Sequence, residues 1–467
     1  MNEHLLASLE EISDLHIGEA ANWKGRRRAR IWFRAVAAVL AAVMLLLVLF
    51  QPEPIAVAAE QLVAPGEYET EPRPDSTDYA DEDAYWDALE DYRDRERALR
   101  AAADDAMAPV RAFWEDSFRA FLDGGENGVW SPVNAYISLA MLAQTSSGST
   151  RQEILDVLGA ESIESLQEDV QAVWQRVWRD EETSKRILAN SLWLDAELEY
   201  REENLQILGE RYHASVYRTS LNSEASDADI QAWLAEQTHG LLKDLSPTGS
   251  RDLGTRVLTL ASVLYVDDNW FETFDPENSR DGLFHSPGGD VDCTYMNALM
   301  ESMRYARGED YTAAALSTEG GCYFWMVLPD EGTAVSDLLD SGDYLTTILD
   351  QEADTRKVQL TMPKFDICDS VELKDGLKNM GIRKAFSFFG GDFSDTLSGV
   401  HTVRVDGIQQ TTRIIVEETG IRAASGTVVD LISAGLDDPV RLVVDRPFLF
   451  VLTLGEIPLF AGVVAEP

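Results

Sequence analysis

Histidine and cysteine are the side chains from which many active sites are built, and this chain shows no readable catalytic set of them. The six histidines are scattered, and the three cysteines have no metal-ligand spacing. These residues are His4, His16, His213, His239, His285 and His401, and Cys293, Cys322 and Cys368. No HExxH motif and no nucleophile–histidine–acid set can be read. We therefore expect a protein that is not an enzyme, binds no metal or other cofactor and buries its cysteines as small hydrophobic side chains, with an intermolecular disulfide as the alternative.

One segment, residues 421–429, has the pattern of a strand that could be added to a sheet. Alternate side chains of a strand point to opposite faces. One face would carry Ile421, Ala423, Ser425, Thr427 and Val429, and the other Arg422, Ala424, Gly426 and Val428. The first set is small or apolar, so Arg422 points to solvent if that set points inward, and a one-residue slip would bury it. Gly420 gives backbone freedom where the chain must turn. The alternative is an ordinary surface hairpin rich in small residues.

The elements that must position this segment come from one long block, residues 104–467, which has no low-complexity break and no internal repeat. Apolar residues at 110–121 recur near helical spacing, and Ser131 followed by Pro132 is typical of a helix start. Strand-like runs follow at 257–266, 323–328, 358–362, 411–416, 441–444 and 448–454. Helices first and strands later predict an α+β fold with a large sheet rather than a doubly wound one.

Short motifs along this block are informative through their order and spacing. They are NGVWSP at 127–132, LAM at 139–141, GST at 148–150, IQAW at 230–233, THG at 238–240, LASVLY at 260–265, FDP at 274–276, MVLP at 326–329, PKF at 363–365, LKNMG at 377–381, DFS at 392–394, RPFLF at 446–450 and LFAG at 459–462. Together they resemble the serpin family of serine protease inhibitors over nearly the whole block. The resemblance implies the serpin fold: N-terminal helices around a large central mixed β-sheet, smaller sheets and an exposed reactive-centre loop.

The resemblance also assigns the family's chemistry to one loop. It implies a hinge that contains Glu418, Gly420, Ile421, Arg422, Ala423, Ala424, Ser425, Gly426 and Thr427. Residues 430–439 would then be the exposed bait. In serpins the target protease attacks the bait and forms an acyl-enzyme, and the cut loop enters the main sheet as an extra strand, which carries the protease to the far pole and distorts it. Family spacing places the reactive bond at Ala434–Gly435, and a loop of different length would move it within residues 431–436.

The residues around this bond indicate the class of protease. Residues 428–439 contain no lysine or arginine, and the candidates near the bond are small or apolar. A trypsin-like pocket requires a basic residue, so we expect elastase-, chymotrypsin- or subtilisin-like serine proteases as partners, with cysteine proteases as the weaker alternative.

The resemblance further implies a region that controls the opening of the sheet. Its residues are Trp270, Ser131, Pro132, Asn134, Ser262 and Gln410. Three of them, Asn134, Ser262 and Gln410, stand where the family often has Ser, Asn and His. The amide and hydroxyl groups can still donate and accept hydrogen bonds, whereas the missing histidine removes a pH-sensitive group. In the hinge, Ile421 and Arg422 stand where Thr and Glu are common, which leaves the efficiency of inhibition open.

The N-terminal residues predict a membrane anchor. Residues 31–50 form an apolar run with a single charge, and about 20 such residues cross a bilayer as a helix. The polar residues 1–30 end in a basic cluster, which places them in the cytoplasm and the rest of the chain outside. We expect an uncleaved single-pass anchor in the cell membrane, typical of a bacterial surface protein; a cleaved signal peptide is the alternative.

Between anchor and block, residues 51–103 are rich in proline and acidic residues, which predicts an extended stalk that becomes a charged helix near 81–103.

The charge of the chain excludes one class of partner. Lys and Arg number 39 against 82 Asp and Glu, so the net charge of −43 repels nucleic acid. We expect a monomer: a membrane-tethered extracellular serpin that traps serine proteases. The alternatives are a non-inhibitory serpin-fold binding or adhesion module, and a signalling protein whose N-terminus couples loop cleavage to a cytoplasmic partner.

Overall fold

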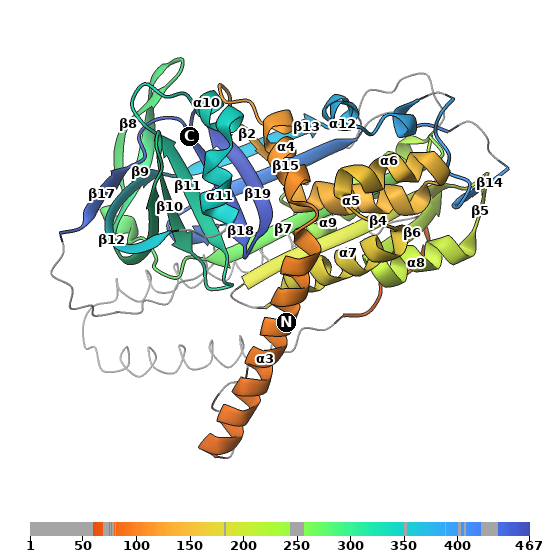
Figure 1. Cartoon of the computed structure of the whole chain (residues 1–467), viewed down its shortest axis with the longest axis horizontal. Helices are drawn as coiled ribbons and strands as arrows, with labels where there is room; N and C mark the ends of the chain where they lie inside the picture. Colours follow the sequence, from red (N-terminus) through yellow and green to blue (C-terminus); the bar gives the residue numbers. More distant parts are fainter. Residues whose placement is uncertain are drawn as a thin grey trace, which may run out of the picture. The chain divides into compact units, whose positions relative to one another are not determined.

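The computed structural model divides the chain into two units, residues 1–55 and 56–467, and all described residues belong to the second (Figure 1). They are residues 59–68, 74, 76, 79, 81–181, 184–242, 256–349, 353–387, 389–399, 403–405, 408–421 and 438–467. None of the helices formed by these residues is long and apolar enough to cross a membrane. The apolar run 31–50, predicted as the membrane anchor, lies outside the described residues.

A layer of helices covers one face of the first of two large sheets (Figure 1). Its members are α4 (Arg111–Phe121), α5 (Pro132–Thr145), α6 (Gly148–Leu158), α7 (Ile163–Val177) and α8 (Glu202–Tyr212). Helix α5 is buried along almost its whole length, and it begins where the sequence predicts, with the Ser131 hydroxyl accepting a hydrogen bond from the Asn134 amide and Pro132 in the first turn. Helix α9 (Glu224–Gln237) packs on the same sheet through a separate apolar cluster around Trp193 and Trp233.

The first sheet has the order β1-β6-β4-β7-β16-β15-β13, with β3 paired to β4. Its strands are β1 (Glu60–Val63), β3 (Arg179–Asp180), β4 (Ser184–Asp195), β6 (Ala214–Thr219), β7 (Leu258–Asn269), β13 (Phe365–Glu372), β15 (Gln409–Val416) and β16 (Gly420–Ile421). Strands β4 and β6 are parallel and the other neighbours antiparallel, so the sheet is mixed as predicted.

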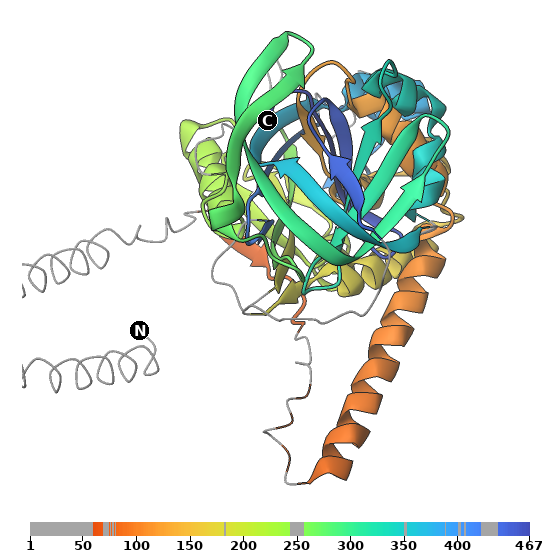
Figure 2. The same ribbon diagram turned by 90° about the vertical axis from the view of Figure 1, so that its left-hand side faces the viewer.

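The second sheet, whose green to blue strands face the viewer in Figure 2, has the order β17-β12-β9-β10-β11-β18-β19-β2, with β8 paired to β9. Its strands are β2 (Gly128–Trp130), β8 (Arg280–Ser286), β9 (Gly289–Arg307), β10 (Tyr311–Ser317), β11 (Tyr323–Pro329), β12 (Asp354–Pro363), β17 (Val440–Val443), β18 (Phe448–Leu454) and β19 (Ile457–Val464). The short strands β5 (Glu199–Tyr200) and β14 (Leu397–Ser398) form a third sheet. The remaining helices are α10 (Val335–Ser341), α11 (Asp343–Leu349), α12 (Lys374–Met380), η2 (Pro276–Asn278) and η3 (Lys384–Phe386). The α+β prediction is confirmed.

The predicted stalk is wrong in two places, because parts of residues 51–103 belong to the folded unit. Strand β1 pairs antiparallel with β6 and forms an edge of the first sheet. Helix α3 (Glu82–Met107) is longer than the charged helix predicted near 81–103, and it packs on α7. Glu96 of α3 forms an ion pair with Arg179 at 3.4 Å. A partner far away in the sequence decides β1, and local composition carries no sign of it, whereas the charge pattern does predict the helix that the structure extends to Met107.

Candidate functional site

The two-residue strand β16 lies between the strands β7 and β15 of the first sheet. Ile421 is the backbone partner of Asp268 in β7 and of Val416 in β15. Its side chain is only 2% exposed, so it points to the buried face, as the alternation predicts. The start of the predicted hinge is therefore already an element of the sheet.

Gly420 is suited to this position because there is no room for a side chain, not because the backbone needs a conformation that only glycine adopts. Its φ is not in the left-handed region. A Cβ at this position would lie 2.3 Å from the Asp268 carbonyl oxygen and 2.8 Å from the Asn269 Cα. The expectation that Gly420 supplies a flexible turn is thus corrected: glycine allows the backbones of β16 and β7 to approach each other.

Trp270 holds the residues just before β16. Its indole Nε1 donates to the Glu417 carbonyl at 2.8 Å, and its amide donates to the Thr419 carbonyl at 3.0 Å. The Phe274 amide donates to the Glu418 carbonyl at 3.1 Å. Trp270 is fully buried and packs edge-to-face on Phe324. Trp270 therefore holds the backbone of residues 417–419, and its assignment to the sheet-opening region stays a prediction.

The Glu418 side chain fastens the same segment to its surroundings. Its carboxylate accepts a hydrogen bond from the Ser279 hydroxyl at 2.7 Å and forms an ion pair with the Lys364 ammonium at 2.6 Å. Burial opposes the ionisation of Glu418, but the bonds from Lys364 and Ser279 outweigh it and lower its pKa. The charged form is thus favoured, and the contact is lost only as the pH falls through this lowered pKa.

All of the predicted sheet-opening residues except Trp270, which lies at the hinge, come together at the start of α5. The Gln410 side chain on β15 makes two bonds with the Ser131 backbone: its Oε1 accepts from the Ser131 amide at 2.7 Å, and its Nε2 donates to the Ser131 carbonyl at 3.0 Å. The Ser131 hydroxyl donates to the Leu459 carbonyl at 2.6 Å. Gln410 therefore takes the place of the missing histidine with a group that has no ionisable proton near neutral pH.

The other half of this polar cluster reaches β7 and β4. The Asn134 Nδ2 donates to the Ser262 carbonyl at 3.0 Å, and the Ser262 hydroxyl contacts Asn134 Oδ1 and donates to Asn190 Oδ1 at 2.6 Å. Sequence reasoning missed Asn190, which lies on β4, although a buried polar residue within a strand was the available signal. Ser131, Asn134, Ser262, Asn190 and Gln410 form the cluster that links α5 to both strands beside β16.

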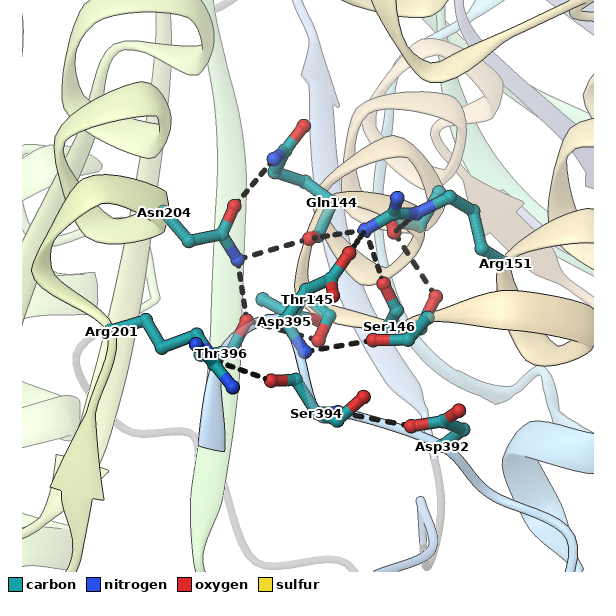
Figure 3. A network of polar contacts seen from close by, with 12 residues as sticks. Gln144, Thr145, Ser146, Arg151, Arg201, Asn204, Asp392, Ser394, Asp395 and Thr396 are labelled. Carbon is teal, nitrogen blue, oxygen red and sulfur yellow. Dashed lines mark hydrogen bonds and ion pairs between the residues drawn. The ribbon is translucent and has the colours of Figure 1, made fainter. Parts of the chain in front are cut away.

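A second polar network holds the connection that leads toward β15 (Figure 3). The Asn204 Nδ2 donates to Thr396 Oγ1 at 2.6 Å and to the Gln144 carbonyl at 3.1 Å, and the Thr396 hydroxyl donates to the Thr145 carbonyl at 3.0 Å. The sequence provides the DFS motif at 392–394 but no contact for it.

Arg151 joins the same connection to α6. Its Nη2 forms a 2.7 Å ion pair with Asp395, and its Nε donates to the Ala143 carbonyl at 3.0 Å. Arg201 Nε donates to the Ser394 carbonyl at 2.7 Å (Figure 3). This network anchors residues 392–396 to α5, α6 and α8.

Several predicted site residues lie outside the described residues. They are Arg422, Ala423, Ala424, Ser425, Gly426, Thr427, Ala434 and Gly435. Their assignments as hinge and reactive bond stay predictions.

Within the described residues, no group of three or more potential metal ligands is found. The cysteines are free, and the expectation of burial is wrong for Cys368, which is exposed on the edge strand β13.

A family model described as Serpin (serine protease inhibitor) matches residues 113–467. The chain belongs to the serpin family. Serpin-Z1C from Triticum aestivum is 26% identical over 360 residues, which cover 73% of this chain and 90% of that protein. Membership in the family supports a protease-inhibitor type of function and favours an inhibitor over an enzyme.

Solved serpin structures share the fold. The thermophilic serpin tengpin in its native state has a TM-score of 0.70 at 24% identity, covering 77% of this chain and 94% of that one. Thyroxine-binding globulin in complex with thyroxine has a TM-score of 0.67 at 20% identity, covering 78% of this chain and 99% of that one. At these identities the likeness concerns the fold alone.

Proposed function

We propose that this serpin traps serine proteases by inserting its cut loop into the first sheet, between β7 and β15. The observation that carries the proposal is β16, because Gly420 and Ile421 already occupy the position between β7 and β15 that a longer strand would continue. Each added backbone hydrogen bond contributes about 1 kcal/mol, so a strand of ten residues between two neighbours supplies about 10 kcal/mol or more.

If the inserted loop continues the pairing register of β16 without a slip, Thr427 would lie at the polar cluster beside the start of α5. Ile421 lies opposite one residue of β7 and one of β15. Six residues farther along the loop, Thr427 would lie opposite the residues six positions back on these strands, which are Ser262 and Gln410. A hydroxyl can both donate and accept, so the one threonine on the inward-facing side would meet the buried polar groups that can pair with it.

The proposed bait is the bond between Ala434 and Gly435, within residues 431–436. The support is the small and apolar sequence there, which suits elastase-, chymotrypsin- or subtilisin-like enzymes and not a trypsin-like pocket. Strand β17, which begins at Val440 and pairs parallel with β12, would hold the far end of the loop.

The proposed location is outside the cell, with residues 31–50 as the membrane anchor and residues 1–30 in the cytoplasm. Because β1 starts at Glu60, only about nine residues separate the proposed anchor from the sheet, and an extended chain of that length spans at most about 30 Å. The serpin domain would then stay near the membrane surface.

The purified full-length chain, kept in detergent micelles, should form an SDS-resistant adduct with an elastase- or subtilisin-like protease, with about the combined mass of the protease and the N-terminal part of the serpin. N-terminal sequencing of the released C-terminal peptide should read from residues 432–437. An enzyme whose active-site serine is blocked serves as control and should give no adduct. Clean cleavage without an adduct would instead favour the non-inhibitory binding module.

A further inference from the structure

Residues 59–68, which we call the clasp, pack on the first sheet and on the helices beside it. They precede the part of the chain that the serpin family model matches, which begins at residue 113. Within the clasp, β1 pairs with β6 and places Val63 opposite Val216. Val63 is 9% exposed, and Ala59 packs on the apolar cluster around Trp193. The clasp is therefore an addition to the family fold that is fitted to this domain.

A glycine inside α8 allows the clasp to lie close to that helix. Gly209 occupies the helix interior, where glycine costs about 1 kcal/mol relative to alanine. A Cβ there would lie 2.5 Å from Val63 Cγ1 and 3.0 Å from the Ala64 carbonyl oxygen. The Gly66 amide donates to the Gly209 carbonyl at 2.9 Å. The clasp thus gives a reason for a residue that disfavours the helix.

An aromatic cluster holds the other end of the clasp. The Tyr68 ring meets Trp174 and Trp178 edge-to-face, with ring centroids 5.1 Å and 5.7 Å apart. Trp174 in turn stacks on the imidazole of His213, with centroids 3.6 Å apart. Aromatic pairs contribute about 0.5–1.5 kcal/mol each beyond the burial of their area. His213 therefore supports the tryptophan against which Tyr68 rests.

His213 also binds the clasp directly. Its Nδ1 lies 3.1 Å from the Gly66 carbonyl oxygen, so this nitrogen carries a proton and donates it. The residue is 7% exposed, and its Nε2 has no hydrogen-bond partner among the described residues. Its φ of 48° is left-handed, a conformation that glycine or asparagine adopts more readily. The imidazole is thus the feature that suits this position to the clasp.

The charge of His213 decides how strongly the clasp is held. Protonation would add an N–H at Nε2, in a buried place without an acceptor. Burial outweighs the Gly66 hydrogen bond and lowers the pKa of His213 from its ordinary value of 6.5. When the clasp leaves, the pKa rises again, so the free form binds the proton more readily. Docking therefore has its full strength above about pH 6.5 and weakens as the pH falls toward the lowered pKa.

The charged groups that the structure describes around His213 do not cause this shift. Its causes are burial and the Gly66 bond. Asp169 on α7 titrates in the same range, because burial raises its pKa to about 6, and it therefore requires a control. The titratable groups on the elements packed against His213 include Glu67 and Tyr68 of the clasp, Asp169 and Arg176 of α7, Glu210, Arg211 and Tyr212 of α8, and Tyr217 and Arg218 of β6.

We propose that residues 59–68 are a clasp that neutral His213 holds on the first sheet and that acid releases. Release would uncover the β6 edge, whose backbone groups could then pair with another strand. It would also leave α3 as the next helix or strand that fastens the N-terminal part of the chain. The inference goes beyond protease trapping, because neither the loop nor the adduct enters it.

Hydrogen exchange of the full-length chain in detergent micelles, read by mass spectrometry, measures docking through the amides of residues 60–66. Their protection, corrected for the intrinsic exchange rate, should fall about tenfold between about pH 7.5 and about pH 5, while that of β18 stays unchanged. His213→Asn suits the left-handed backbone and cannot become charged. Its clasp should be less protected than the wild-type clasp at neutral pH, and equally protected at both pH values.

His239→Asn is the matched control, because His239 has the same backbone conformation, with a φ of 49°, but is exposed at the end of α9. This variant and Asp169→Asn should both keep the wild-type pH change. Wild-type protection that stays constant or rises in acid would overturn the proposal. A His213→Asn chain that keeps the pH change, or an Asp169→Asn chain that loses it, would do the same.

Gly209→Ala tests the contact without changing a charge. Alanine favours the helix, but its methyl group would meet Val63, so clasp protection should fall about tenfold at both pH values. Unchanged protection in this variant would show that the close approach to α8 does not hold the clasp, and the proposal would fail. A chain that forms no adduct with a protease would leave these results unaffected, so the failure of the proposed function is distinguishable from the failure of the clasp.

Discussion

Replacing Ile421 by glutamate should convert the inhibitor into a substrate. The adduct fraction should fall about a hundredfold while the loop is still cleaved. Ile421 is 2% exposed and is the backbone partner of Asp268, which is also fully buried. Insertion would then bury a second negative charge next to the first, at a cost of about 3 kcal/mol or more. The adduct and the cleaved serpin are quantified on one denaturing gel.

Two variants separate burial from other effects of the Ile421 change. Ile421→Val keeps an apolar β-branched side chain and should retain the adduct. Arg441→Glu places glutamate on the exposed side of β17, near the other end of the loop, and should leave the adduct fraction within about twofold. An unchanged adduct fraction in Ile421→Glu would show that this residue does not enter the sheet.

Gly420→Ala should expel the start of the hinge from the sheet. The new methyl group would meet the Asp268 carbonyl oxygen and the Asn269 Cα, both backbone atoms of β7 that cannot move aside alone. Overpacking of this kind costs about 1–3 kcal/mol. We expect a lower melting temperature of the intact chain and an adduct fraction reduced about tenfold, measured by calorimetry and by gel.

Gly288→Ala is the matched control for this change. Gly288 lies in the turn between β8 and β9, and a Cβ there meets no atom within 4 Å. Its melting temperature and adduct fraction should stay near the wild-type values. If Gly420→Ala behaves like Gly288→Ala, the close approach of β16 to β7 has no role in trapping.

The sequence alone predicts the parts of the site that depend on local alternation or local caps. Ile421 is buried because every second residue of its strand faces inward, and α5 begins at Ser131–Pro132 because a hydroxyl and a proline suit a first turn. The strand-like run at 448–454 coincides with β18 for the same reason, since it is an unbroken run of apolar and β-branched residues bounded by proline and glycine.

Contacts that depend on distant partners could not be predicted in this way. Strand β1 is short and half polar, and only its pairing with β6 makes it a strand. In the sequence, Arg186 and Asp268 look like two ordinary charged residues. In the structure both are fully buried and lie 4.0 Å apart, and Arg186 donates to the carbonyl of Gly320, which lies 134 residues away in the sequence. From the sequence, Gly420 is expected to be a flexible turn residue. In the structure its lack of a side chain lets β16 approach the backbone of β7.

The melting temperature of the nicked chain compared with that of the intact chain tests the central claim most directly. A protease inactive toward the folded core would cut within residues 431–436, and calorimetry would follow both forms in the same detergent. If the cut loop becomes a strand between β7 and β15, its added hydrogen bonds should raise the melting temperature by about 20 °C. A nicked chain that melts at or below the temperature of the intact one would contradict insertion.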